Sequence, residues 1–167
     1  GILAGCAPGV EPGFHRYEVT VTNLTNAQPL TPPAVVLHRK GYTPWVLGEP
    51  AADGLERLAE SGDPSDFVAD AEADPDVATT AVAGGGVAPG ASRTLEVGPA
   101  LSTGLRLSLA TMVAGTNDGF AGTGGFLLSE LGAEGRKVLL VPALDAGTEA
   151  DTETQASVPA LGGEGWN

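Results

Sequence analysis

Glycine and proline recur so often along this chain that its regular elements must be short. The 167 residues include 25 Gly and 13 Pro, which are spread from end to end. Frequent Gly and Pro residues favour many turns over long helices. Between the turns, apolar and polar residues alternate: residues 15–25, HRYEVTVTNLT, place Tyr17, Val19 and Val21 on one face. A period of two predicts half-buried strands.

One segment departs from the strand period. Leu55, Leu58 and Ala59 recur at helical spacing, so a helical insertion is expected at about residues 53–74. Asp53 and Ser65 are the expected N-caps of two short helices, and Gly62 is an expected C-cap. The Gly-rich stretch 116–125 is expected to be a tight loop. Further strands are expected at residues 34–40, 76–84, 93–99, 105–115 and 138–144, the last as a buried apolar run. The predicted fold class is all-β: an antiparallel β-sandwich with a short helical insertion.

The charge balance restricts the ligands that such a domain can bind. Eight Lys and Arg residues face 21 Asp and Glu residues, which gives a formal net charge of −13. Nucleic acid and anionic bilayers are disfavoured, because both require a basic face. Cations or a basic protein partner suit this charge. The single cysteine, Cys6, excludes an internal disulfide and a cysteine-based zinc site.

The N-terminal stretch GILAGCAPG has two interpretations. LAGC resembles the lipobox of secreted lipoproteins, in which Cys6 carries the lipid and residues 1–14 form a tether. Alternatively, Ile2 and Leu3 belong to a strand in the chain's own sheet or on a neighbour's edge. An accident of cloning is the third explanation. The first predicts a lipid-anchored protein of the cell surface, and a strand on a neighbour's edge would form a filament or oligomer.

Carboxylates gather where two strands end. Asp145 ends the last expected strand, Glu149 follows across a turn opened by Gly147, and Asp118 follows the strand at 105–115. If both loops lie at one end of the sheets, the three carboxylates converge and repel one another unless a cation neutralises them. Oxygen ligands without imidazole or thiolate select Ca²⁺, with Mg²⁺ as the alternative. The other interpretation is three solvated turn carboxylates.

Four stretches together resemble the spondin N-terminal domain family, the domain of F-spondin and mindin, in its stand-alone prokaryotic form. They occur in the family's order and cover most of residues 15–155, leaving 156–167 as an irregular tail. The family's Pro-Ser-Pro-Asp-Trp loop reads GTNDG here, and the C-terminal cysteines of relatives are missing. The stretches are YEVTVTNLT…QPLTPPAVVLHRK, LGEPAADGLERLAESGD, LSLATMVAGTNDGFAG and VPALDAGTEADTE.

The resemblance implies a metal-binding β-sandwich. The family's ligands match Asp118, Asp145 and Glu149, and a family glutamate at the end of the helical segment matches Glu60, either as a further ligand or as a surface contact. The implied function is a non-catalytic, calcium-binding domain that mediates adhesion or matrix-type contacts with a surface protein or glycan. The alternative is a structural subunit of a surface filament or oligomer, assembled through the apolar N-terminus.

Signals for an enzyme are weak. His15 and His38 lie in expected strands, where a histidine with satisfied hydrogen bonds or an exposed one is the usual case. Ser108 and Ser129 have no nucleophile elbow around them. Trp45 is expected either in an exposed contact patch or packed at the core or edge. A hydrolase that uses its carboxylates is the remaining alternative.

Overall fold

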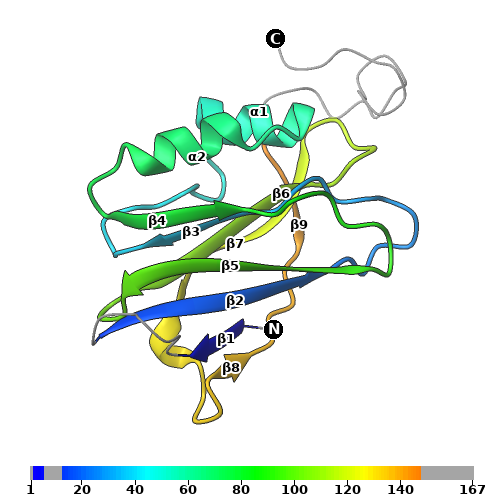
Figure 1. The fold of residues 1–167 in the computed structure, drawn as a ribbon. Coiled ribbons are helices and arrows are strands. Elements are labelled where there is room, and N and C mark those ends of the chain that lie inside the picture. Colours follow the sequence, from blue (N-terminus) through cyan, green and yellow to red (C-terminus); the bar gives the residue numbers. More distant parts are fainter. Residues whose placement is uncertain (1, 6–12, 148–167) are drawn as a thin grey trace.

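The computed structural model describes residues 2–5 and 13–147, which form two antiparallel sheets and two α-helices (Figure 1). The expectation of a β-rich, antiparallel fold with a helical insertion is therefore confirmed. The helices are α1 (Asp53–Ser61) and α2 (Ser65–Glu72), and Leu128–Glu130 form a 3₁₀ turn. The strands are β1 (Ile2–Gly5), β2 (Phe14–Thr22), β3 (Ala34–His38), β4 (Val77–Val82), β5 (Ser92–Leu101), β6 (Arg106–Met112), β7 (Gly119–Leu127), β8 (Arg136–Lys137) and β9 (Ala143–Asp145).

The N-terminal segment is a strand of the chain's own sheet. The four-stranded sheet has the order β5-β2-β1-β8, so β1 lies between two other strands. Ile2 is opposite Val19 on one side and opposite Lys137 on the other. Of the N-terminal interpretations, an ordered strand is the one that this pairing supports. Cys6 lies outside the described residues.

The five-stranded sheet, in the order β4-β3-β6-β7-β9, is covered on both faces. Val35 and Leu37 of β3 join a core cluster with residues of β2 and β5, from the other sheet. Ala34 and Val36 point the opposite way and join a cluster with the helices. Because both faces are covered, β3 reads as a continuous apolar run instead of an alternating one.

The two helices lie side by side over the outer face of the five-stranded sheet (Figure 1). Leu55, Leu58 and Ala59 of α1 are buried against that face, as their helical spacing predicts. Gly62 ends α1 with a φ of 76°, and its N–H donates to the Leu58 carbonyl at 2.9 Å. This confirms the predicted C-cap, because the left-handed conformation favours glycine.

The predicted N-caps are wrong by one residue. Asp53 and Ser65 are the first helical residues, and the cap positions belong to Ala52 and Pro64. The acceptor at the start of α2 is instead Asp63, whose carboxylate receives the Ser65 N–H at 3.0 Å.

Two strand predictions need larger corrections. The expected loop 116–125 contains most of β7, which pairs with β6 on one side and with β9 on the other. Conversely, the apolar run expected as a buried strand at 138–144 is strand only from Ala143, and Leu140 is 84% exposed. The exposed part of that run connects β8 in one sheet to β9 in the other.

Candidate functional site

The pairing of β7 with β9 places Asp118 and Asp145 at the same end of the five-stranded sheet. Gly119, the residue after Asp118, is directly opposite Asp145. The Ala146 N–H donates to the Asp118 backbone carbonyl at 3.1 Å. The backbones that carry these two predicted ligands are therefore neighbours. Asp118 is opposite Ala146, one position from Asp145, so the two side chains start from opposite faces of the strand pair.

The two aspartates differ in exposure and in local bonding. Asp118 is 4% exposed, whereas Asp145 is exposed. One carboxylate oxygen of Asp145 accepts the Gly147 N–H at 2.6 Å, and Gly147 has a φ of 72°. This bond closes a tight turn and leaves the other carboxylate oxygen for a second partner. Asp145 thus has a structural role that requires no metal.

Helix α1 lies over this same end of the sheet. Leu55 and Leu58 share a core cluster with Phe120 and Ala146, which closely follow the two aspartates in the chain. Glu60, the fourth predicted ligand, is on the same helix and is 4% exposed. Three of the four predicted residues therefore belong to elements that pack together at one end, and Glu149 lies outside the described residues.

Within residues 2–5 and 13–147, no three His, Cys, Asp or Glu side chains group closely enough to hold a metal ion. Calcium takes about 6–8 oxygen ligands, which include carbonyls and waters as well as carboxylates. Asp118 and Asp145 are thus the described part of a candidate site. Its completion requires oxygen ligands from the residues after Gly147, from backbone carbonyls or from solvent.

A buried serine–histidine pair lies on β3 and β6. His38 is 1% exposed, and its Nδ1 lies 2.8 Å from the Arg39 carbonyl, to which only a protonated nitrogen donates. Nε2 consequently accepts the hydrogen bond from the Ser108 hydroxyl, at 2.7 Å. Ser108 Oγ also accepts the Gly125 N–H at 2.8 Å. Burial lowers the pKa of His38, with a further contribution from the positive charge of Arg106.

This pair resembles the serine–histidine unit of hydrolases, but its surroundings favour a structural role. Ser108 is completely buried, so its oxygen cannot reach a substrate. The bond from Gly125 lies where the β6–β7 register shifts, between the pairs at Leu107 and Leu109. The pair therefore anchors an irregular part of the sheet, and the prediction of a hydrogen-bonded strand histidine is confirmed for His38.

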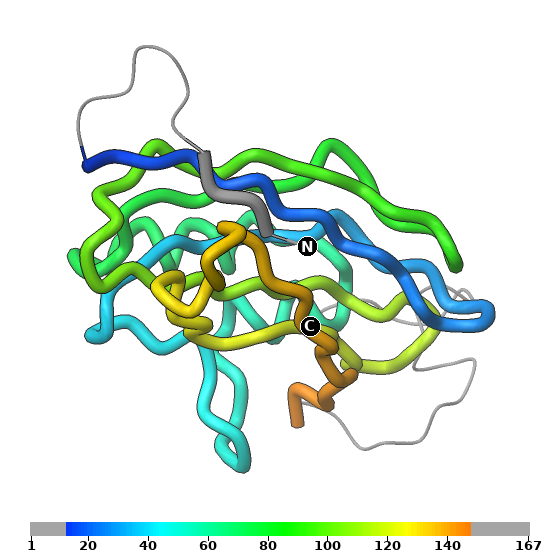
Figure 2. The backbone as a smooth tube through the Cα atoms, turned by 90° about the horizontal axis from the view of Figure 1, so that it is seen from below, coloured from blue at the N-terminus to red at the C-terminus, as the bar shows by residue number. Residues whose placement is uncertain are grey.

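A cavity of about 550 Å³ opens beside His38, and sequence reasoning missed it. It lies between the β3–α1 loop and β7, on the face that also carries the helices. Figure 2 shows part of that loop, in cyan, projecting from the body of the molecule. Trp45 of this loop lines the cavity and packs edge-on against Phe120 at 5.1 Å. This bears out the packed interpretation of Trp45. In the sequence, the cavity is indicated only by the aromatic residues of the loop at 42–45 and by the distant Gly-rich stretch at 122–125.

No family model matches the chain, and no curated protein matches it. The resemblance to spondin N-terminal domains therefore depends on the four sequence stretches alone. Among the residues that the structure describes, none of the helices has the length and apolar character needed to cross a membrane.

Proposed function

We propose that this chain is a non-catalytic, calcium-binding β-sandwich domain of the spondin N-terminal type. The observation that carries the proposal is the neighbouring backbone position of Asp118, which directly precedes β7, and Asp145, the last residue of β9. The sandwich is supported by the core cluster that unites Val35 and Leu37 of one sheet with Tyr17 and Val97 of the other. Calcium would hold the end loops together and offset local repulsion between carboxylates.

The proposed role is adhesion or matrix-type contact at a cell surface, with a surface protein or glycan as partner. The net charge of −13 agrees with a cation-dependent role, because bound calcium reduces repulsion and provides a positive site on an acidic surface. An extracellular location is proposed from the lipobox-like stretch; a lipid on Cys6 is the alternative to β1, because processing before Cys6 would remove residues 2–5, which form that strand. Metabolic labelling with a fatty-acid analogue, compared with Cys6→Ser, tests that attachment.

Calcium titration by calorimetry tests the metal site. We expect saturable binding by the whole chain, a loss of about tenfold or more in affinity for Asp145→Asn, and weaker binding of Mg²⁺. Calcium that binds only the folded state should also raise the melting temperature, and chelation should reverse this increase.

The matched control is Glu134→Gln, which removes an exposed carboxylate from the segment before β8, away from β7 and β9. This variant should bind calcium like the parent chain. If Asp145→Asn and the parent chain bind calcium equally, the carboxylates at this end are turn residues only and the proposal is wrong.

Assembly through the N-terminus is the second candidate, in the form of an exchange of β1 between neighbouring molecules. β1 joins β8 to the rest of the sheet through two residue pairs, Ile2–Lys137 and Leu3–Arg136. A strand from a neighbouring molecule could take the same place beside β2. The chain would then act as a structural subunit of a filament or oligomer.

Deletion of residues 1–10 tests this candidate by light scattering after size-exclusion chromatography. If the N-terminal strand drives assembly, the parent chain forms oligomers and the deleted chain is a monomer. An unchanged distribution of oligomers after the deletion would contradict the idea. A circular dichroism spectrum of the deleted chain shows whether the sheets persist.

A further inference from the structure

The cavity beside His38 differs in charge from the rest of the molecule. The chain has 21 acidic residues, yet no Asp or Glu of the described residues lines this cavity. Lys40 and Arg106, two of the eight basic residues, do line it. His38 also lines it but uses both ring nitrogens in hydrogen bonds. The wall is thus cationic, on a chain whose net charge is negative.

Arg106 is held in place and still has donor capacity. Its Nη1 donates to the Gly125 carbonyl at 3.1 Å, which fixes the guanidinium against the wall of the cavity. Its Nε is buried and has no hydrogen-bond partner among the described residues. Because Nε is buried from solvent, it is out of reach of a ligand, and an acceptor in the cavity would interact with the charge and the Nη donors of this guanidinium. A carboxylate is the group that best matches the planar guanidinium.

The remaining walls suit a ring-shaped ligand. Gly122 and Gly124 line the cavity, and a Cβ at Gly122 would come within 3.2 Å of the Trp45 ring. The absence of these side chains lets the indole lie close to β7. Tyr42 lines the cavity too, and its ring meets His38 edge-on at 4.9 Å. Burial and the nearby carboxylates of Asp74 and Asp70 raise the pKa of Tyr42 to about 12, so its hydroxyl keeps its proton.

We propose that this cavity binds a carboxylated sugar residue. The carboxylate lies at Arg106 and Lys40, the ring lies beside Trp45 and Tyr42, and the Tyr42 hydroxyl is available to a sugar hydroxyl. The volume of about 550 Å³ lies within the range of small-molecule sites, about 300–1,000 Å³. The site differs from the proposed calcium site in its ligands, because neither Asp118 nor Asp145 lines the cavity, although Leu144, the neighbour of Asp145, does.

The net charge of −13 opposes the approach of any anion, but the contact itself is local. At physiological ionic strength, exposed charges more than about 8 Å apart are largely screened. The carboxylates of Asp70 and Asp74 act on the Tyr42 side of the cavity and oppose an anion there, whereas Arg106 and Lys40 line the wall and act at contact distance. We therefore expect the cavity to bind one carboxylated sugar unit. A long polyanion should bind little more tightly than a single unit.

The experiment follows the indole N–H signal of Trp45 by NMR during titration with sodium glucuronate. Loss of this signal in Trp45→Phe identifies it, and glucose serves as the neutral sugar of the same shape. We expect a saturable shift with glucuronate, none with glucose at equal ionic strength, and the same result with a calcium chelator present. Persistence with the chelator separates this site from the proposed function.

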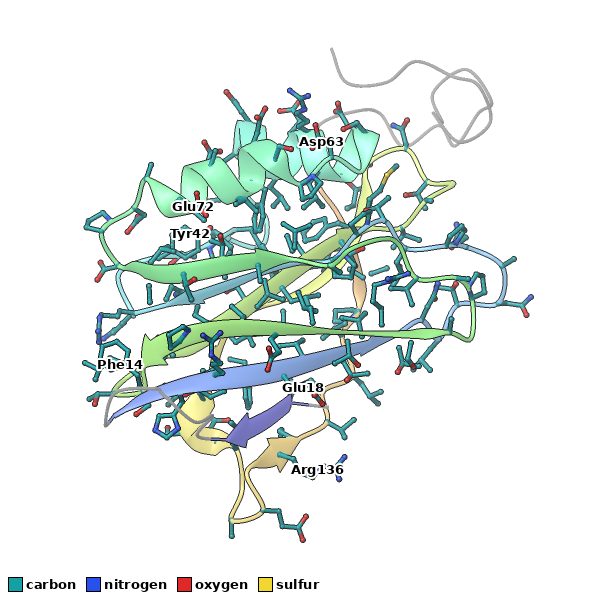
Figure 3. All side chains as sticks on the ribbon, viewed as in Figure 1. Phe14, Glu18, Tyr42, Asp63, Glu72 and Arg136 are labelled. Carbon is teal, nitrogen blue, oxygen red and sulfur yellow. The ribbon has the colours of Figure 1, made fainter. Side chains whose placement is uncertain are left out.

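Arg106→Gln should weaken glucuronate binding by about tenfold or more, because a charge-assisted hydrogen bond is lost. Arg136→Gln is the matched control, since Arg136 extends from β8 on the opposite side of the molecule from Tyr42 (Figure 3). If Arg106→Gln fails to fold, Lys40→Gln replaces it, because Lys40 is exposed and its loss should still weaken binding.

Three results would overturn the proposal. They are equal shifts with glucose, no saturable shift with glucuronate, and equal affinity of the Arg106→Gln and Arg136→Gln variants. Benzoate tests the sugar assignment: if it binds more tightly than glucuronate, the cavity is a site for aromatic acids, and the proposed ligand class is wrong.

Discussion

His38 shows how one buried residue links stability to pH. Its ring bridges the Arg39 carbonyl and the Ser108 hydroxyl, an arrangement that requires the neutral form. Burial is the largest cause of its lowered pKa, and the positive charge of Arg106 adds to it. The carboxylates of Asp74 and Asp76 oppose this shift without reversing it. Protonation would remove the acceptor that Ser108 uses.

We predict a loss of stability as the pH falls below about 6.5, the ordinary pKa of a histidine in the unfolded chain. In that range the unfolded chain binds a proton that folded His38 does not, so the free energy of unfolding decreases with falling pH. The loss continues down to the lowered pKa of the folded state, with a slope of at most about 1.4 kcal/mol per pH unit. Urea unfolding between pH 5 and 8 measures it.

Replacement of the ring provides the control for this prediction. His38→Gln should be less stable at all pH values and should lose the slope between about pH 6.5 and 5. His15→Gln, at the half-buried second position of β2, should keep the parent's slope. A slope that survives in His38→Gln would assign the pH dependence to carboxylates elsewhere.

At the level of elements, the termination of α1 is a sensitive point. Gly62 has a positive φ, and an added Cβ would meet the Thr31 side chain and approach the Met112 sulfur at 3.3 Å. We predict that Gly62→Ala lowers the free energy of unfolding by about 2 kcal/mol, from backbone strain and crowding together. Gly132→Ala is the matched control, because nothing lies within 4 Å of its added Cβ. Equal stability of the two variants in urea would contradict the prediction.

Sequence reasoning succeeded for the elements that bury only one side. β2 and α1 have one buried side each, so their periods of two and of about 3.6 identify them. β7 was missed because four of its nine residues are glycines, which usually indicate a loop. Here the Trp45 ring, on a distant loop, covers Gly122 and Gly124. Trp45 and these glycines are too far apart in the sequence for a local pattern to predict their contact.

The exposed run at Val138–Val141 was misjudged for the opposite reason. An apolar run of that length is typical of a buried strand, but Val138 is 70% exposed and Leu140 is 84% exposed. The run has no sheet partner because it passes from β8 in one sheet to β9 in the other. The sheet topology decides which strands a connecting segment joins. The local pattern of apolar residues does not show this.

For the molecule as a whole, the sequence indicated that Asp118 and Asp145 lie at one end of the sheet, and it did not indicate the cavity. Asp118 directly precedes β7 and Asp145 ends β9, and the pairing of these two strands places both residues at one end of the sheet. The cavity combines Lys40, Trp45 and Arg106, which are isolated residues of unremarkable local context. Only the assembled sheet shows that they share a surface from which acidic side chains are absent among the described residues.

The position of β1 also has a consequence for synthesis on the ribosome. Its first partner, β2, emerges early, but its second partner is β8, at Arg136 and Lys137. Until those residues leave the exit tunnel, one side of β1 displays unpaired backbone groups to every nearby nascent chain. Translation speed through the region between β7 and β8 would therefore influence how many chains complete the sheet alone and how many pair with a neighbour.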